Sequence, residues 1–222
     1  MKKLKELEKQ NEGKRYKSYF LSYNEKENNY KDSFLVEDIG KRWKGKGKFY
    51  YDDKLIYDGE IAEGKFNGKG KEYNKYDESL EYEGEFVDWN WSGKGKKYNK
   101  GKLTYEGEFL KGKKNGKGIE YFSDNSRVEG EYIEDRKNGT FKEYKDDKLI
   151  SIKEYDDNSL IKGKELDKEG KIIYEGTYKS GSYLDGKYNE YFEDGKISFE
   201  AEYKNSVFGT GKNMIKVVIY YQ

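Results

Sequence analysis

Glutamate is the residue type whose spacing in this chain could support catalysis. Glu85, Glu108 and Glu131 recur at one place in a repeated pattern, so a regular fold would bring them onto one face. A pair of carboxylates at a suitable separation is the catalytic device of glycoside hydrolases. A repeated glutamate can instead pair across strands with the equally regular lysines. Because catalysis needs one asymmetric site, we favour the pairing and expect no enzyme.

The composition removes most other catalytic chemistry. The chain has 222 residues and contains neither histidine nor cysteine. Nucleophile systems of the Ser/His and Cys/His types, the usual zinc sites and disulfides are therefore excluded. The Asp-rich turns lack the ligand spacing of a calcium-binding loop, and turn propensity explains them. We expect no catalytic residue, no cofactor and no metal site.

Two stretches resemble a phosphate-binding loop but break its pattern. They span residues 40–46 and 181–187, and the next residue is Gly47 or Tyr188 where Ser or Thr is required. Neither stretch has a strand-to-helix context. Both arise from a Gly-Lys element that recurs along the chain, so they predict no nucleotide site.

The charge balance bears on the class of partner. Lys plus Arg number 45 and Asp plus Glu number 44, with the two signs mixed and a net charge of +1. A dedicated nucleic-acid binder shows a net basic stripe. The mixed charges of this chain therefore disfavour nucleic acid as a partner, unless it is reached through a bound nucleoprotein. The small net charge also gives little attraction to anionic lipid. A membrane-proximal phospholipid-binding scaffold remains the alternative to a protein partner.

Tryptophan marks the strongest irregularity. Trp89 and Trp91 stand where other units have Lys, Asn and Gly, and Trp43 occupies the place of Trp91 further upstream. A tryptophan near a turn is costly to expose and is enriched in binding hot spots. Alternatively, each indole folds back over the Gly-rich strand beside it. Together with residues of the aromatic face, the candidate partner-binding residues are Trp43, Trp89, Trp91, Tyr82, Phe86, Tyr105 and Phe109.

The elements that would position these residues form a repeat. The sequence Tyr-Glu-Gly-Glu-Phe at 82–86 recurs at 105–109, and a Gly-Lys-Gly element follows about 11 residues after each of these starts, at 93–95 and 116–118. A fixed period of this length is typical of repeat arrays. The units start at Phe34, Tyr57, Tyr82, Tyr105, Val128, Ile152, Tyr174 and Phe199.

Within each unit the pattern has period 2. Aromatic residues that alternate with charge and are bounded by Gly and Asn predict strands. The Asn-Gly pairs at 67–68, 115–116 and 138–139 predict tight hairpin turns. Further turns are predicted at 100–101, 123–126, 146–147 and 194–195. The sequence therefore predicts an all-β fold, an elongated antiparallel meander of about eight stacked β-hairpins.

These motifs resemble the MORN repeat, which has a Tyr-Glu-Gly-Glu-aromatic opening followed by a turn and a Gly-Lys-Gly strand. The resemblance covers residues 34–221, is strongest at 57–132 and is looser after Gly139. It implies a twisted β-meander with a binding or scaffolding role toward proteins or, in some proposals, phospholipids, and no catalysis. The departures are Val36, Glu154 and Ala201 in place of glycine, and Val128 and Ile152 in place of the aromatic residue.

The domain organisation follows from the repeat. Residues 1–33 are expected to form an N-terminal cap with a short helix or a frayed end and irregular strands, and residues 34–222 the array. Residues 216–221, the most apolar stretch, are expected to form a terminal strand. The sequence shows no signal peptide, which predicts a cytoplasmic location.

The leading functional hypothesis is a non-enzymatic protein that grips another protein with its ribbon. By analogy alone, the partner would be an effector to be neutralised, as by an inhibitor, antitoxin or immunity protein. A nucleic-acid or nucleoprotein-binding inhibitor is a second alternative. The sequence does not indicate the partner or the oligomeric state.

Overall fold

The computed structural model describes residues 18–24, 29–35, 44–204 and 214–219. All regular secondary structure in these ranges is β-strand. The chain divides into unit 1, Met1–Lys113, and unit 2, Lys114–Gln222, and each is described by itself. The predicted all-β antiparallel meander is confirmed within both units.

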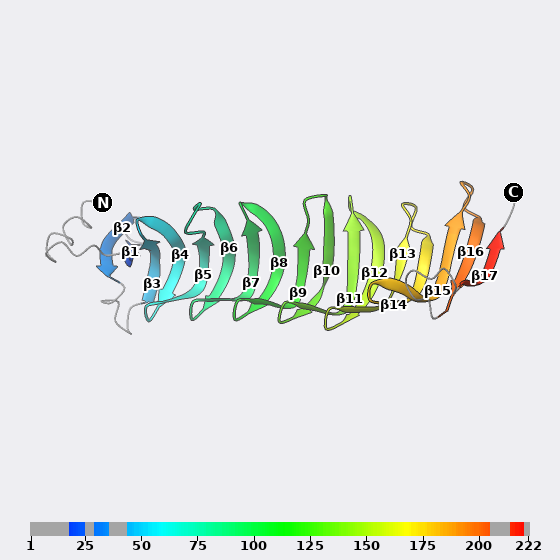
Figure 1. Ribbon diagram of the computed structural model, residues 1–222. Coiled ribbons are helices and arrows are strands. Elements are labelled where there is room, and N and C mark those ends of the chain that lie inside the picture. The colour runs from blue at the N-terminus through cyan, green and yellow to red at the C-terminus, as the bar shows by residue number, and fades with distance from the viewer. Residues whose placement is uncertain (1–17, 25–28, 36–43, 205–213, 220–222) are drawn as a thin grey trace. The chain divides into compact units, whose positions relative to one another are not determined.

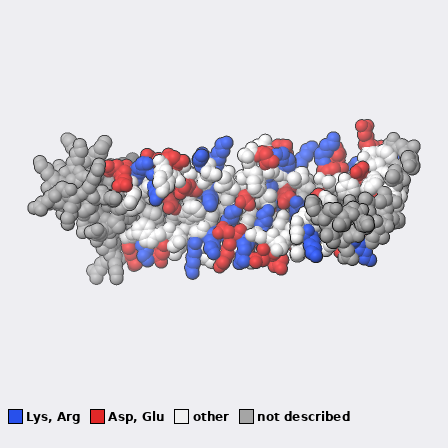
Figure 2. Space-filling model, in the orientation of Figure 1, with Lys and Arg blue, Asp and Glu red and all other residues white. Residues whose placement is uncertain are grey.

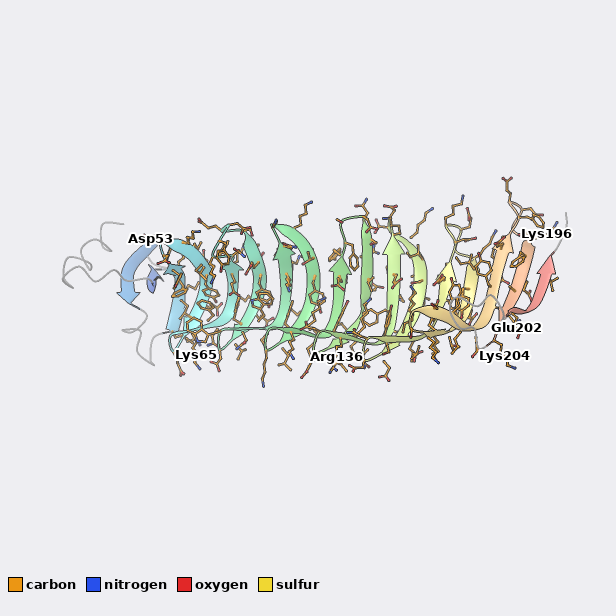
Figure 3. The ribbon with its side chains drawn as sticks, viewed as in Figure 1. Asp53, Lys65, Arg136, Lys196, Glu202 and Lys204 are labelled. Carbon is orange, nitrogen blue, oxygen red and sulfur yellow. The ribbon has the colours of Figure 1, made fainter. Side chains whose placement is uncertain are left out.

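Unit 1 is an antiparallel sheet in which each strand from β3 to β8 pairs with the next (Figure 1). Its turns alternate between two edges, with Asp53 at one edge and Lys65 at the other (Figure 3). The strands are β1 (Ser18–Asn24), β2 (Asn29–Leu35), β3 (Lys44–Tyr51), β4 (Lys54–Ala62), β5 (Lys65–Tyr73), β6 (Leu80–Val87), β7 (Asn90–Asn99) and β8 (Lys102–Leu110).

The start of unit 1 differs from the predicted succession of strands. Strand β2, which contains Phe34, pairs with β1, and β1 also pairs with β3. The strand order is therefore 2-1-3, and the hairpin expected to begin at Phe34 is not formed by adjacent strands. The helix expected near the N-terminus lies outside the described residues.

Unit 2 is also an antiparallel sheet of sequential neighbours from β9 to β17. The predicted terminal strand is confirmed as β17, which pairs with β16. The strands are β9 (Lys113–Tyr121), β10 (Ser126–Ile133), β11 (Arg136–Lys145), β12 (Lys148–Asp156), β13 (Ser159–Leu166), β14 (Ile172–Lys179), β15 (Ser182–Tyr191), β16 (Ile197–Tyr203) and β17 (Met214–Ile219).

A tyrosine laid across a row of glycines makes the core of several repeats. Gly84 in β6 stands opposite Gly95 in β7. The Tyr82 hydroxyl donates a hydrogen bond to the Glu85 carbonyl at 3.0 Å. A Cβ atom on Gly95 would lie 2.2 Å from the hydroxyl oxygen of Tyr82. The glycine is thus required by the ring that covers it, and the arrangement recurs at Tyr57 and Tyr174.

The Asn-Gly pairs do not form the turns, so that prediction was wrong. Asn67 and Gly68 lie inside β5, where two extra residues opposite β4 form a bulge, and Gly68 has φ +77°. The Asn67 side-chain oxygen accepts a 3.4 Å hydrogen bond from the Asp88 N–H, which links consecutive hairpins. Two-residue turns with positive φ lie nearby instead, at Glu63-Gly64, Asp88-Trp89, Lys111-Gly112 and Glu134-Asp135.

The turns predicted at the other edge are confirmed. The chain turns at Lys100-Gly101 and Asp146-Asp147, with positive φ at all four residues, and at 123–125 and 193–195. The Asn-Gly prediction failed because an Asn-Gly pair accommodates positive φ in a bulge as readily as in a turn.

One repeat in unit 2 is displaced by one residue from its predicted start. Ser151, not Ile152, occupies the buried opening position and is 2% exposed. Side chains alternate along a strand, so Lys153 follows on the same face at the place that glycine takes elsewhere. The displacement puts a charged side chain on the inner face of the sheet.

Candidate functional site

The outer face of unit 1, which points away from the buried rings, carries paired charges. Lys71 lies 3.2 Å from Glu83, and Lys96 lies 3.4 Å from Glu106. The register also places the recurrent Glu85 opposite Lys69, as the cross-strand interpretation predicts. Both signs of charge are interspersed over the surface seen in Figure 2.

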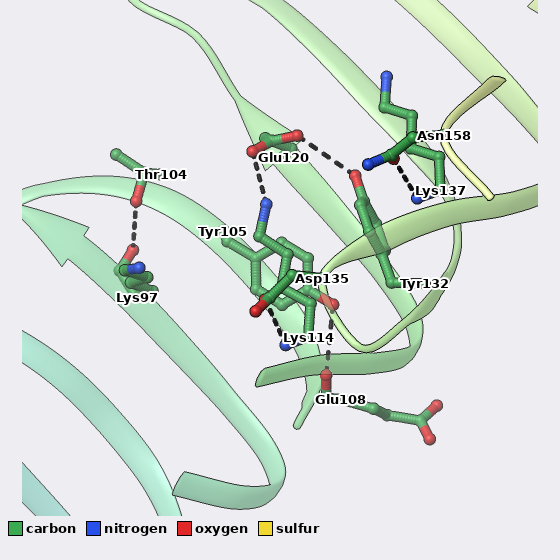
Figure 4. Close-up of polar contacts among 10 residues, drawn as sticks. All are labelled: Lys97, Thr104, Tyr105, Glu108, Lys114, Glu120, Tyr132, Asp135, Lys137 and Asn158. Atoms are coloured by element: carbon green, nitrogen blue, oxygen red, sulfur yellow. Dashed lines mark hydrogen bonds and ion pairs between the residues drawn. The ribbon is translucent and has the colours of Figure 1, made fainter. Parts of the chain in front are cut away.

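Four of the predicted site residues are core residues. Tyr82, Phe86, Tyr105 and Phe109 have exposed fractions of 0% to 4%. Their rings meet edge to face at centroid distances of 5.1–5.2 Å. The Tyr105 hydroxyl donates to the Glu108 carbonyl at 3.3 Å (Figure 4). These rings hold the repeats together, and their burial leaves a partner no access to them in the folded state.

Trp91 folds back over the sheet. Its ring stacks parallel to Tyr82 with centroids 4.6 Å apart, and its indole N–H donates to a Glu72 carboxylate oxygen at 2.5 Å. Burial raises the pKa of Glu72, the bond from Trp91 opposes that shift, and nearby Glu81 adds to it. Trp91 is therefore a packing residue, in agreement with the alternative weighed for the tryptophans.

Trp89 is the predicted site residue that remains exposed. It is the second turn residue between β6 and β7, with φ +73° and 41% exposure. Its ring packs on Phe66 with centroids 4.4 Å apart. Val87 and Leu110 end their strands at the same edge and are 54% and 51% exposed. We call Val87, Trp89 and Leu110 the turn-edge patch. Trp43 lies outside the described residues.

The inner face of unit 2 holds a group of charges that the sequence did not reveal. The Lys114 ammonium lies 2.6 Å from a Glu120 carboxylate oxygen, and the Tyr132 hydroxyl donates to the other oxygen at 3.3 Å (Figure 4). The Lys114 and Glu120 side chains are only 17% and 28% exposed. This pair is the first part of what we call the lysine cluster, which comprises Lys114, Glu120, Lys137, Glu143 and Lys153.

Glu143 is the second carboxylate of the lysine cluster. It accepts hydrogen bonds from Ser151 at 2.6 Å and from Lys153 at 2.9 Å. Burial raises the pKa of Glu143, but these two bonds and the charges of Lys153 and Lys137 outweigh burial, so the pKa lies below its ordinary value.

Lys137 completes the lysine cluster. Its ammonium lies over the rings of Phe141 and Tyr155, at 5.1 Å and 5.0 Å from their centroids. Burial lowers the pKa of Lys137, against the opposing effect of Glu143 and Glu120. The signal that could have found it is positional, because Lys137 comes two residues after a hairpin turn, where unit 1 has Phe66 and Trp91.

The described residues contain no group of three or more acidic side chains arranged to hold a metal ion. Among the same residues, no helix is long and apolar enough to cross a membrane.

Antiparallel hairpins in which tyrosine rings cover rows of glycine define a class of β-hairpin repeat proteins. The sequence profile of the MORN repeat matches residues 57–76 and 105–127, so the resemblance to this repeat is confirmed for these two stretches. Such repeats are generally binding or scaffold modules and are typically non-catalytic. A search of curated proteins gave no match to this chain.

Proposed function

We propose that this protein is a non-enzymatic binding protein that contacts another protein through the turn-edge patch of unit 1. The observation that carries the proposal is Trp89, an indole held in a hairpin turn with positive φ and 41% exposed. Tryptophan is enriched among interface hot spots, so an indole exposed in a turn is a candidate for contact with a partner.

The surroundings of Trp89 suit a protein interface. Its ring rests on Phe66, so the indole is held in place before binding. Val87 and Leu110 follow the buried Phe86 and Phe109, so they add aliphatic surface on the outer side of the same edge. The ion pair between Lys65 and Asp88, at 3.0 Å, supplies a polar rim. An apolar centre with a polar rim is the usual anatomy of protein–protein contacts.

The narrower hypothesis, neutralisation of an effector, gains no support from the described residues or from the comparisons. We therefore propose a protein partner with an apolar pocket that accepts the indole, and leave its activity outside the proposal.

The test compares capture of proteins from the native cell extract by the full chain and its variants. Trp89→Gly removes the indole and suits the positive φ, so the turn keeps its conformation. Loss of a hot spot weakens binding by about thirtyfold. Leu110→Ser should weaken it less. Tyr76→Ser is the matched control, because Tyr76 is 77% exposed in the connection between β5 and β6, at the opposite end of β6 from Trp89.

One stoichiometric partner that is lost with Trp89→Gly and kept with Tyr76→Ser supports the proposal. Equal capture by all variants contradicts it. Flotation with acidic lipid vesicles is measured in parallel, and flotation that depends on Trp89 would replace the protein partner with a membrane.

A further inference from the structure

The lysine cluster of unit 2 contains one ammonium group without a carboxylate. Lys114 and Lys153 are paired with Glu120 and Glu143. Lys137 has neither a side-chain hydrogen bond nor an ion pair among the described residues, and its ammonium lies over two aromatic rings. Three ammonium groups against two carboxylates leave one positive charge.

The Lys137 ammonium is also reachable from solvent. Within the described part of the chain, every fully buried side-chain nitrogen or oxygen has a hydrogen-bond partner. Since the Lys137 ammonium has none, its nitrogen must keep some contact with water. A half-buried cation that is accessible at its tip is able to accept an anion without prior unfolding.

We propose that the lysine cluster binds one carboxylate group, which pairs with the Lys137 ammonium while its apolar stem lies against the partly exposed ring of Tyr155. A single negative charge matches the single unbalanced positive charge of the cluster. A phosphate dianion would exceed it and would meet repulsion from Glu120 and Glu143. This inference goes beyond the proposed function, because it concerns unit 2 and does not depend on the turn-edge patch.

The surrounding residues favour a carboxylate with a stem over a bare anion. The ring of Tyr155 is partly exposed and gives an apolar surface beside the cation, and it packs edge to face at 5.4 Å on the fully buried ring of Phe141. The two carboxylates already present hold the other lysines in place, which reduces the cost of ordering the site. The carboxylate could belong to a free small acid or to an acidic side chain of a protein.

The experiment measures two probes by isothermal titration calorimetry on the full chain, 3-phenylpropionate and an end-blocked Phe-Glu dipeptide. We expect the unmodified chain to bind at least one of them. Lys137→Met should lower the affinity about tenfold or more, because a charge-assisted contact is lost. Lys142→Met is the matched control, because Lys142 lies next to Phe141 in β11 and is exposed, and it should leave the affinity unchanged.

A second variant tests the charge balance in the opposite direction. Glu143→Gln keeps an acceptor for Ser151 and Lys153 but adds one unbalanced positive charge, so carboxylate affinity should rise, and misfolding cannot produce such a gain. Binding of the free acid alone indicates a small-molecule ligand, whereas binding of the dipeptide alone indicates an acidic side chain, and either supports the proposal. Failure of both probes to bind, or equal affinity in Lys137→Met, would overturn it.

Discussion

The inner faces of unit 1 and of the first hairpins of unit 2 differ at one position of the repeat, the second residue after the hairpin turn. In unit 1 this position holds Phe66 and Trp91, which stack on the tyrosines of their repeats at 3.8 Å and 4.6 Å. In unit 2 it holds Lys114 and Lys137 after the first two turns, and then Leu160 and Tyr183. Tyr183 stacks on Tyr174 at 3.8 Å, as the rings of unit 1 do. The backbone pattern is the same in both, so the occupant decides whether the face is closed by packing or left charged.

The inner glutamates differ in the same way. Glu72 in unit 1 has a neutral donor, Trp91, and burial raises its pKa. Glu143 in unit 2 has Ser151 and Lys153 as donors, and its pKa is lowered although burial opposes this. One repeat position therefore carries a destabilised charge in unit 1 and a stabilised charge in unit 2.

The largest effect on stability is expected from removing one of the buried rings that cover the inner face of unit 1. Tyr82→Ala should lower the free energy of unfolding by about 3–5 kcal/mol, because it leaves a cavity over Gly84 and Gly95. Urea denaturation followed by tyrosine and tryptophan fluorescence measures the change. Tyr76→Ala should stay within about 0.5 kcal/mol, and a similar loss in both variants would contradict the assignment of the core.

A smaller loss of stability is expected when an aromatic residue at this position in unit 1 is replaced by lysine, the residue found at Lys114 and Lys137 in unit 2. Trp91→Lys removes the stack on Tyr82 and should lower the free energy of unfolding by about 2–3 kcal/mol. Trp91→Phe keeps a ring on Tyr82 and should cost about 1 kcal/mol. The comparison would fail if Trp91→Lys were as stable as the unmodified chain in urea denaturation.

The smallest effect concerns pH and should have opposite signs in the two units. The raised pKa of Glu72 means that its contribution to stability is present at low pH and is lost as pH rises through that pKa. The lowered pKa of Glu143 means that its contribution is present at neutral pH and is lost as pH falls through that pKa. Solvent screening keeps each contribution near 0.5 kcal/mol.

Unfolding midpoints between pH 3 and pH 7 measure these contributions. At pH 7, Glu72→Gln should stabilise the protein and Glu143→Gln should destabilise it. The contrast between the two glutamates would be refuted by shifts of the same sign.

Much of the fold could be predicted from the sequence, because the same residue pattern recurs in several units. The strands follow from the alternation at 82–86 and 105–109, and the turn at Asp146-Asp147 follows from its residue types. The role of Asn67-Gly68 could not be separated from a turn, because bulges and turns both call for positive φ. The one-residue displacement at Ser151 was hidden because Ser151 is polar, whereas Ile152 beside it is apolar like the opening residues of the other units.

The candidate site was less predictable than the fold. Trp89 stood out because tryptophan is rare in this chain, and the structure leaves it exposed. Lys137 did not stand out, because a lysine beside a turn in a chain with 40% charged residues looks like any surface lysine. Only the tertiary structure shows that Lys137 faces inward between two rings.

We infer that the residue at this repeat position determines whether the inner face is closed by packing or is able to bind a ligand. A pair of measurements on Lys137→Met is the most direct test of this inference. Urea denaturation at pH 7 should show no loss of stability, because burial disfavours the charge that is removed. Calorimetry on the same variant should show carboxylate affinity about tenfold lower or more. A variant that unfolds more easily and binds carboxylate as tightly as the unmodified chain would contradict the account.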